Sequence, residues 1–241
     1  MISNQMELRR RGMPLQDDLE RMKELSFNQL CIRLNHEDAA IRSAAVIAMR
    51  KNGNLQDREY VSLLLERLSC ERALYTRLEL SSSLEQGKEE TAIWMCEYLG
   101  SIGTNQHTCV PNAVSKKKSY PLPRDIVARI LGKMNDSVLA CLVNQLPSID
   151  IPAKYELIDA VGFGIFYHRD LGTMENFQVI FNTYHELRED ELMVWKLALC
   201  CSAFPIPGCI EMLKDIIDSY QNTIICAEAK RSIILLENKL K

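Results

Sequence analysis

Several features that define other protein classes are missing from this sequence of 241 residues. It has no run of about eighteen apolar residues, which a membrane-spanning helix needs, and residues 1–11 are polar and basic, unlike a secretory signal. Its nine cysteines include no C-x-x-C pair, so neither a cysteine-based metal site nor a disulfide framework is expected. We therefore expect a cytoplasmic protein with reduced cysteines and no contact with a membrane.

An excess of basic charge is missing as well, and aromatic residues are scarce. Lys and Arg number 29 against 32 Asp and Glu, the formal net charge is -3, and aromatic residues make up 7% of the chain. Nucleic-acid binding relies on a basic surface, so we expect no nucleic-acid partner. The sequence also lacks a phosphate-binding loop, a nucleophile elbow and a dinucleotide fingerprint, and it predicts neither a cofactor nor a catalytic residue.

Apolar residues with helical spacing are what the chain does contain. They recur over residues 26–34 and again over residues 41–49, with a polar turn at residues 35–37 between the two stretches. Ser26 is placed to cap the first helix, and Gly53 follows the second. The apolar positions are Phe27, Leu30, Cys31, Leu34, Ile41, Ala44, Ala45, Ala48 and Met49. This pattern predicts a helical hairpin.

The hairpin pattern recurs along the chain. Superposing Arg42 on Arg77 also matches Ala45 with Leu80, and continuing the alignment selects one residue per hairpin at intervals of 32 to 47 residues. These residues are Arg42, Arg77, Arg124, Glu156, Lys196 and Lys230. The longest interval contains an irregular stretch, which we interpret as an inserted loop at 101–120. Residues 1–23 are expected to form a capping helix, and residues 24–241 the repeat array.

These units resemble HEAT repeats of the armadillo superfamily, particularly the short repeats related to phycobilin-lyase subunits. Ile41-Arg42, Ala44-Ala45 and Ala48-Met49 fit the pattern of the family's second helix. The resemblance implies an all-α, right-handed superhelix of about six hairpins, whose second helices line a concave face. It also implies that a partner would contact residues on those helices. The candidates are Arg77, Glu79, Arg124, Asp125, Arg129, Glu156 and Asp159.

The basic residues that the alignment selects have two interpretations. They could form an anion-binding ladder along the groove, or each could bond an acidic residue or a carbonyl group of the adjacent repeat. We favour the structural interpretation, because an unpaired charge between packed repeats is costly. The acidic partners that the hairpin turns offer are Asp38, Glu71 and Asp190.

Two other segments carry separate expectations. Lys116, Lys117 and Lys118 form the one dense basic run; such a run is usually a solvated loop, but it could steer an acidic peptide or phosphate toward the groove. Gly162 and Gly164 lie in an apolar helical segment. Glycine disfavours a helix interior, so we expect close packing or a kink there.

The function that this pattern favours is a non-catalytic scaffold or regulatory subunit that binds a protein or peptide on the concave face. The alternative is a HEAT-like enzyme or its subunit, similar either to a chromophore lyase or to an alkylpurine DNA glycosylase, with Asp159, Trp195 and Arg129 in the latter's site. Two His-Glu pairs also resemble the di-iron motif of deoxyhypusine hydroxylase. That family uses four such pairs, so no metal is expected.

Overall fold

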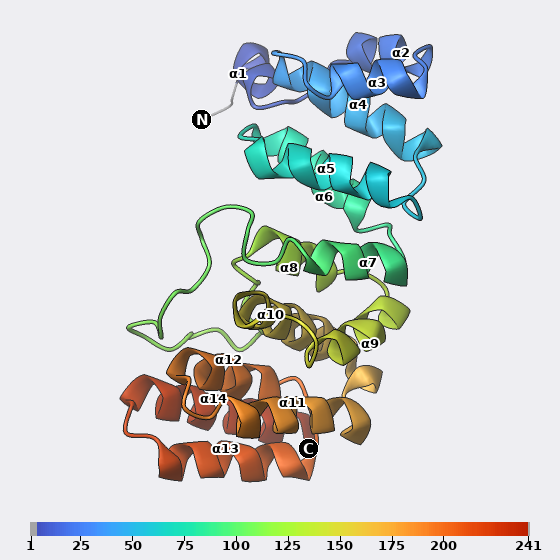
Figure 1. Cartoon of the computed structure of the whole chain (residues 1–241). Coiled ribbons are helices and arrows are strands. Elements are labelled where there is room, and N and C mark those ends of the chain that lie inside the picture. Colours follow the sequence, from blue (N-terminus) through green and yellow to red (C-terminus); the bar gives the residue numbers. More distant parts are fainter. Residues whose placement is uncertain (1–3, 241) are drawn as a thin grey trace. The chain divides into compact units, whose positions relative to one another are not determined.

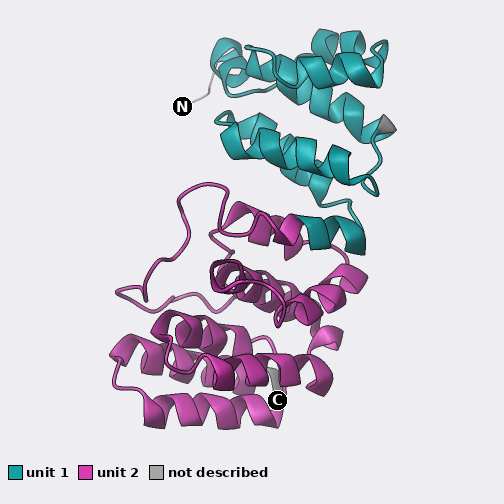
Figure 2. Cartoon of the chain, in the orientation of Figure 1, with its two compact units in different colours: residues 1–94 teal, residues 95–241 magenta. Residues whose placement is uncertain are grey.

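The computed structural model describes residues 4–240 and shows an all-α chain, with no strand in that range. This confirms the helical fold class expected from the sequence. The chain divides into two compact units, residues 1–94 and residues 95–241 (Figure 2), and the boundary falls within helix α7. Among the described residues, no helix is long and apolar enough to cross a membrane.

Unit 1 is built around helix α4, against which α1, α2, α3 and α6 all pack (Figure 1). Ala44, Ala45 and Met49 of α4 are fully buried, and the two alanines let neighbouring helices approach closely. A hydrogen bond of 2.8 Å joins Ser43 Oγ of α4 to Thr76 Oγ1 of α6. The helices are α1 (Gln5–Arg10), α2 (Gln16–Lys23), α3 (Phe27–Arg33), α4 (Ala39–Asn52), α5 (Arg58–Cys70), α6 (Leu74–Leu84) and α7 (Glu89–Cys96).

Unit 2 contains a row of packed helices in which α8 contacts α10, α10 contacts α12 and α12 contacts α14. Helices α9, α11 and α13 pack beside this row, and every residue of α12 from Leu192 to Cys201 is buried. The helices are α8 (Ile126–Leu131), α9 (Asp136–Gln145), α10 (Ile151–Tyr167), α11 (Met174–Glu186), α12 (Glu191–Cys201), α13 (Pro207–Ser219) and α14 (Thr223–Leu240), with a 3-10 turn, η1 (Arg169–Leu171), after α10.

Short polar side chains determine where many of these helices begin. Each accepts a hydrogen bond from a backbone N–H of the first turn, which has no partner within the helix. Ser26 caps α3 as the sequence predicted, with Gln29 N at 3.4 Å from its Oγ. The other side-chain caps of this kind are Asn4, Asp38, Asp57, Asp125, Asn135, Asp150, Thr173 and Asp190.

Two segments differ from the sequence-based expectation. Residues 1–23, predicted to form one capping helix, contain both α1 and α2. The chain bends between them at Gly12, whose φ of 92° favours glycine. The insertion predicted at 101–120 belongs to a longer stretch without helix, residues 97–125, because Asp125 rather than a residue near 120 caps the next helix.

The two glycines of α10 make close contacts, as the sequence predicted. A Cβ atom at Gly162 would lie 2.0 Å from the hydroxyl oxygen of Tyr120, and one at Gly164 would lie 2.3 Å from Cδ2 of Leu139. Tyr120 is only 3% exposed and its ring contacts Phe166, so it cannot move aside. Leu139 is buried as well, at 1% exposed, but the nearest atoms are the methyl ends of its side chain, and these shift at a lower cost than an aromatic ring.

We therefore predict that Gly162→Ala destabilises the protein by about 2–3 kcal/mol through overpacking. Gly164→Ala is the matched control and should change the stability by less than about 1 kcal/mol, because the helix propensity of alanine offsets the small rearrangement. Urea unfolding of the full chain measures both. Equal effects of the two substitutions would show that Tyr120 is not held in place.

Candidate functional site

The same type of hydrogen bond, made by an arginine in the second helix of a helix pair, occurs in both units. Arg42, Arg77 and Arg129 are each the fourth residue of their helix, α4, α6 and α8. Each guanidinium group donates a hydrogen bond to the backbone carbonyl six residues earlier. The acceptors are His36 at 2.7 Å, Glu71 at 3.0 Å and Pro123 at 2.9 Å. The arginine therefore ties the turn before a second helix to the first turn of that helix.

This contact corrects the predicted alignment of the repeats after the second hairpin. Arg129, not Arg124, is equivalent to Arg42 and Arg77. The fourth residues of α10, α12 and α14 are Lys154, Val194 and Cys226, whereas the sequence alignment selected Glu156, Lys196 and Lys230. An aspartate cap four residues before the arginine, in Asp38 to Arg42 and Asp125 to Arg129, is the signal that gives the correct register.

The carboxylate of Glu71 joins the first two hairpins. Arg42 Nε and Nη2 donate to its two oxygens at 2.7 and 2.8 Å, and Arg67 lies at 3.1 Å. The backbone N–H groups of Arg72 and Ala73 also donate to it. Although burial alone raises the pKa of Glu71, the bonds from Arg42 and Ala73 outweigh it and hold that pKa below its ordinary value. The structural interpretation of Arg42 is thus confirmed, and the structure selects Glu71 among the three candidate partners.

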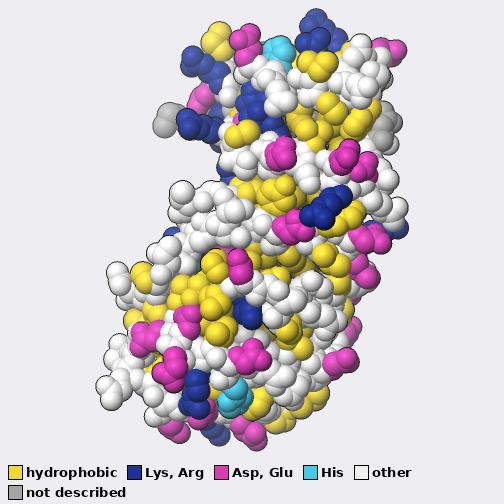
Figure 3. All heavy atoms as spheres, viewed as in Figure 1, with side chains coloured by type: hydrophobic (Ala, Val, Ile, Leu, Met, Phe, Trp, Pro, Cys, Tyr) yellow, Lys and Arg dark blue, Asp and Glu magenta, His cyan; other side chains and the backbone are white. Residues whose placement is uncertain are grey.

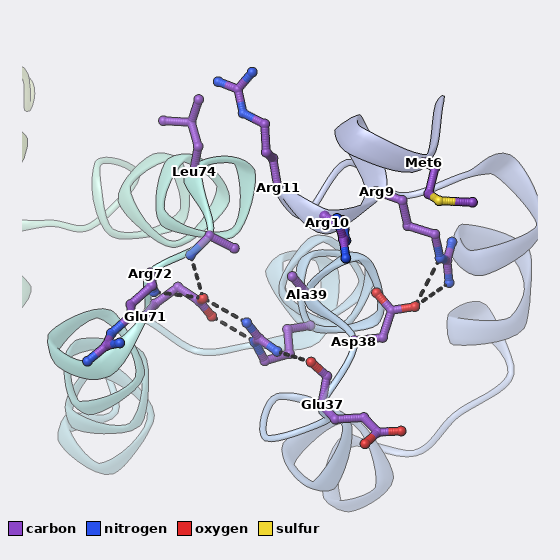
Figure 4. A pocket seen from close by; sticks show the side chains of 12 residues that line it. Met6, Arg9, Arg10, Arg11, Glu37, Asp38, Ala39, Glu71, Arg72 and Leu74 are labelled. Atoms are coloured by element: carbon purple, nitrogen blue, oxygen red, sulfur yellow. Dashed lines mark hydrogen bonds and ion pairs between the residues drawn. The ribbon is translucent and has the colours of Figure 1, made fainter. Parts of the chain in front are cut away.

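An arginine cleft of about 640 Å³ lies beside this network in unit 1 (Figure 4). Its walls come from α1, from the turns that precede α4 and α6, and from the first residues of those helices. The lining residues are Met6, Arg9, Arg10, Arg11, Glu37, Asp38, Ala39, Arg42, Glu71, Arg72, Ala73 and Leu74. Five arginines and three acidic residues therefore line the cleft. Lys and Arg side chains are frequent on the visible face of unit 1 in Figure 3.

The five arginines fall into two groups. Arg42 is bound to Glu71, and Arg9 is held by Asp18 at 2.5 Å and Asp38 at 2.7 Å. The other three are exposed and form no ion pair with any residue between 4 and 240; they are Arg10, Arg11 and Arg72. Arg11 lies over the ring of Tyr75 at 5.6 Å. The paired arginines build the cleft, and the unpaired ones give it positive charge.

Most of the partner-binding residues predicted from the sequence have structural contacts. Arg77 donates to the Glu71 carbonyl, Glu79 pairs with Arg50 at 2.5 Å, and Arg129 donates to the Pro123 carbonyl. Asp125 is fully buried, where it caps α8 and accepts a bond of 2.7 Å from Gln106. Arg124 is exposed and lies 3.2 Å from the Nδ1 atom of His107.

The remaining two predicted residues, Glu156 and Asp159, lie together in unit 2 around the ammonium group of Lys196. Its Nζ is 2.8 Å from Asp159 Oδ2 and 3.2 Å from Glu156 Oε1, and Lys196 is fully buried. Burial raises the pKa of Glu156 to about 7; the Lys196 ammonium opposes this shift only in part, and the charge of Asp159 adds to it. Burial alone lowers the pKa of Lys196, but the two carboxylates outweigh it and raise that pKa.

The predicted lysine loop has exposed side chains and a backbone that is held. Lys116, Lys117 and Lys118 are all exposed. Arg231 of α14 donates to the carbonyl oxygens of Lys117 at 2.8 Å and Ser119 at 3.1 Å. The three ammonium groups are therefore displayed on a loop that is attached to unit 2.

The fold and site define an all-helical protein of packed helix pairs with a positively charged cleft. No protein-family model, curated protein or solved structure matches the chain. Within the described range, no group of three or more His, Cys, Asp or Glu residues is arranged to hold a metal ion, and the nine cysteines are all free.

The arginine cleft was not predicted from the sequence. The run Arg9-Arg10-Arg11 was a possible signal, but it lies in the segment expected to be only a cap. Residues near 10, 38 and 72 are far apart in the chain, and only the packing of α1 on α4 and of α4 on α6 brings them together.

We predict that Glu71→Ala destabilises the protein by about 3–5 kcal/mol, because it leaves buried arginine and backbone donors without their acceptor. Glu79→Ala is the control in the same unit: its pair with Arg50 is about a quarter exposed on each side, so its loss should cost only about 1 kcal/mol. Chemical denaturation compares the two variants. Similar losses would contradict the role of Glu71.

Glu156 should make the stability depend on pH. Its folded pKa of about 7 exceeds the ordinary 4.5, so the folded state keeps a proton that the unfolded chain loses, and stability falls as the pH rises through this window. Glu156→Gln removes this pH dependence. Between pH 4.5 and 7 the free energy of unfolding of the variant, relative to that of the wild type, should increase by about 3 kcal/mol. The exposed Glu186→Gln serves as control. A Glu156→Gln curve parallel to that of the wild type would contradict the prediction.

Proposed function

We propose that this chain is a non-catalytic protein-interaction module, in which about six HEAT-like hairpins form a right-handed superhelix and a partner binds along the second helices. The all-helical chain and the packing of successive second helices within each unit support this architecture. The proposal places the module in the cytoplasm, where the nine free cysteines stay reduced.

The arginine cleft, which lies against α1 at the starts of the second helices α4 and α6, is the observation that carries the proposal of a binding surface. Arg10, Arg11 and Arg72 are exposed there without an acidic partner in the described chain. Met6 and Leu74, which also line the cleft, are 73% and 42% exposed. Arginine beside apolar surface is typical of residues that contribute most to protein interfaces.

The partner proposed for this cleft is an acidic segment of another protein. Three unpaired guanidinium groups favour carboxylates, each of which can accept two hydrogen bonds from one arginine. Met6 and Leu74 offer contacts to apolar side chains that flank those carboxylates. The paired residues Arg9, Arg42 and Glu71 keep the cleft in shape and need not contact the partner.

The first test measures the affinity of the full chain for a fluorescent oligoglutamate peptide of about eight residues. Charge reversal in Arg10→Glu/Arg11→Glu/Arg72→Glu should weaken binding at least about tenfold, because it removes the unpaired cations without touching the Glu71 network. Anisotropy titrations at low and moderate salt measure the loss, and thermal unfolding checks that the variant is folded.

The matched control is Lys116→Glu/Lys117→Glu/Lys118→Glu, which changes the net charge by the same amount in unit 2. It should slow association at low salt, if the lysine loop steers acidic ligands, while leaving the affinity at moderate salt within about threefold. An equal loss in both triple variants would mean that net charge alone attracts the peptide, and would refute the arginine cleft as a specific site.

The glycosylase-like alternative keeps one supporting observation, since Asp159 and Trp195 line the same pocket in unit 2. Two contacts weigh against it. Asp159 is bound to Lys196, and the guanidinium of Arg129 is bound to the Pro123 carbonyl. Base excision from alkylated DNA that is lost in Asp159→Asn would favour this enzyme over the interaction module.

A further inference from the structure

A pocket of about 180 Å³ lies in unit 2, separate from the arginine cleft. Its walls come from α10, α12 and α14, and residues 107–124 cover it. Trp195, Tyr120, Leu199 and Pro121 supply apolar surface, while Asp159 and Glu228 supply carboxylate groups. Because a cavity of about 150 Å³ holds a benzene ring, the pocket has room for a ligand of about one ring.

Three residues that line this pocket each have a buried polar atom without a hydrogen-bond partner. The atoms are Asp159 Oδ1, Trp195 Nε1 and the Tyr120 hydroxyl oxygen, and the three residues are only 6%, 6% and 3% exposed. Leaving such atoms unpaired costs stability, so buried polar groups in proteins are nearly always hydrogen-bonded. Asp159 Oδ1 is an acceptor, Trp195 Nε1 is a donor and the Tyr120 hydroxyl can act as either, so a ligand would find hydrogen-bonding groups of both kinds here.

The buried charges next to Asp159 do not balance. Glu156 and Asp159 share the single ammonium group of Lys196. Burial raises the pKa of Glu156 to about 7, so this carboxyl group partly compensates by binding a proton. A ligand cation at Asp159 Oδ1 would supply the missing positive charge directly.

The other charged groups around the pocket do not neutralise this surplus negative charge. Glu228 is bound to Arg231 at 2.7 Å. Burial, with the nearby charges of Lys196 and Arg124, lowers the pKa of His107, which favours a neutral imidazole. Arg124 is exposed, and water screens its charge.

We propose that this pocket binds a small organic cation, a protonated amine or amidinium of about one ring in size. Its N–H groups bond Asp159 Oδ1, and its apolar part lies against Trp195 and Tyr120. The indole face favours a cation as well as an apolar group. This inference does not depend on the arginine cleft, because the pocket lies wholly in unit 2.

The test is an NMR titration of the ¹⁵N-labelled full chain with benzylammonium, using benzyl alcohol as the neutral analogue of the same shape. The chain has two tryptophans, and the spectrum of Trp195→Phe assigns their indole signals. We expect a saturable shift of the Trp195 signal with a Kd of about 1 mM or below, and at least about tenfold weaker binding of the alcohol. The Trp94 signal, from unit 1, should not move.

Two variants locate the cation. Asp159→Asn should weaken benzylammonium binding at least about tenfold, and Glu156→Gln, which removes the surplus negative charge and leaves the Asp159–Lys196 pair, should weaken it several-fold. Circular dichroism checks both folds. If Asp159→Asn does not fold, the comparison of ammonium with alcohol in the wild type still decides the question.

A lysine side chain of another protein carries the same chemistry, so N-acetyl-lysine methylamide is titrated in parallel. Tighter binding of this probe than of benzylammonium would support the cation site and assign it to a lysine of a partner. Equal affinities for benzylammonium and benzyl alcohol, unchanged binding in Asp159→Asn, or no Trp195 shift with any probe up to about 20 mM would overturn the proposal.

Discussion

The carboxylate of Glu71 is the acceptor on which the construction of unit 1 depends. It takes hydrogen bonds from the guanidinium of Arg42, which belongs to the preceding hairpin, and from two backbone N–H groups at the start of α6. The backbone carbonyl of Glu71 accepts a hydrogen bond from the guanidinium of Arg77. Because this one residue fixes the turn before α6 relative to α4, it also shapes the wall of the arginine cleft that carries Arg72, while the other two unpaired arginines, Arg10 and Arg11, lie at the end of α1.

Unit 2 also contains a buried charged group bound by groups of opposite charge, but there the central charge is positive. There a cation, Lys196, is the fully buried hub, and Glu156 and Asp159 of the neighbouring helix α10 surround it. Two carboxylates against one ammonium leave a surplus of negative charge, whereas the Glu71 hub in unit 1 is held by two arginines, Arg42 and Arg67. The two units therefore differ in the charge of the central buried group, which is negative in unit 1 and positive in unit 2, and so in the charge of the ligands that they favour.

The sequence predicted the helices and the Ser26 cap, because both follow from local spacing and from short polar residues at turns. For the basic residues it offered three acidic candidates, and only the structure selects Glu71 as the partner of Arg42. It misplaced the repeat register after the second hairpin, since an alignment of apolar and basic residues ignored the aspartate caps that begin α8, α10 and α12. Lys196 was consequently aligned with Arg42, although it lies two positions later in its helix and bonds Glu156 and Asp159 of α10.

By itself, the sequence determined where helices start and which faces they bury, because capping and amphipathic spacing act over a few residues. Only the tertiary structure decided which charges neutralise one another and which remain free. The bonds from Arg42 to Glu71 and from Lys196 to Asp159 join residues 29 and 37 positions apart. Such pairs depend on how helices pack, and helix packing depends on the summed contacts of many side chains rather than on any local pattern.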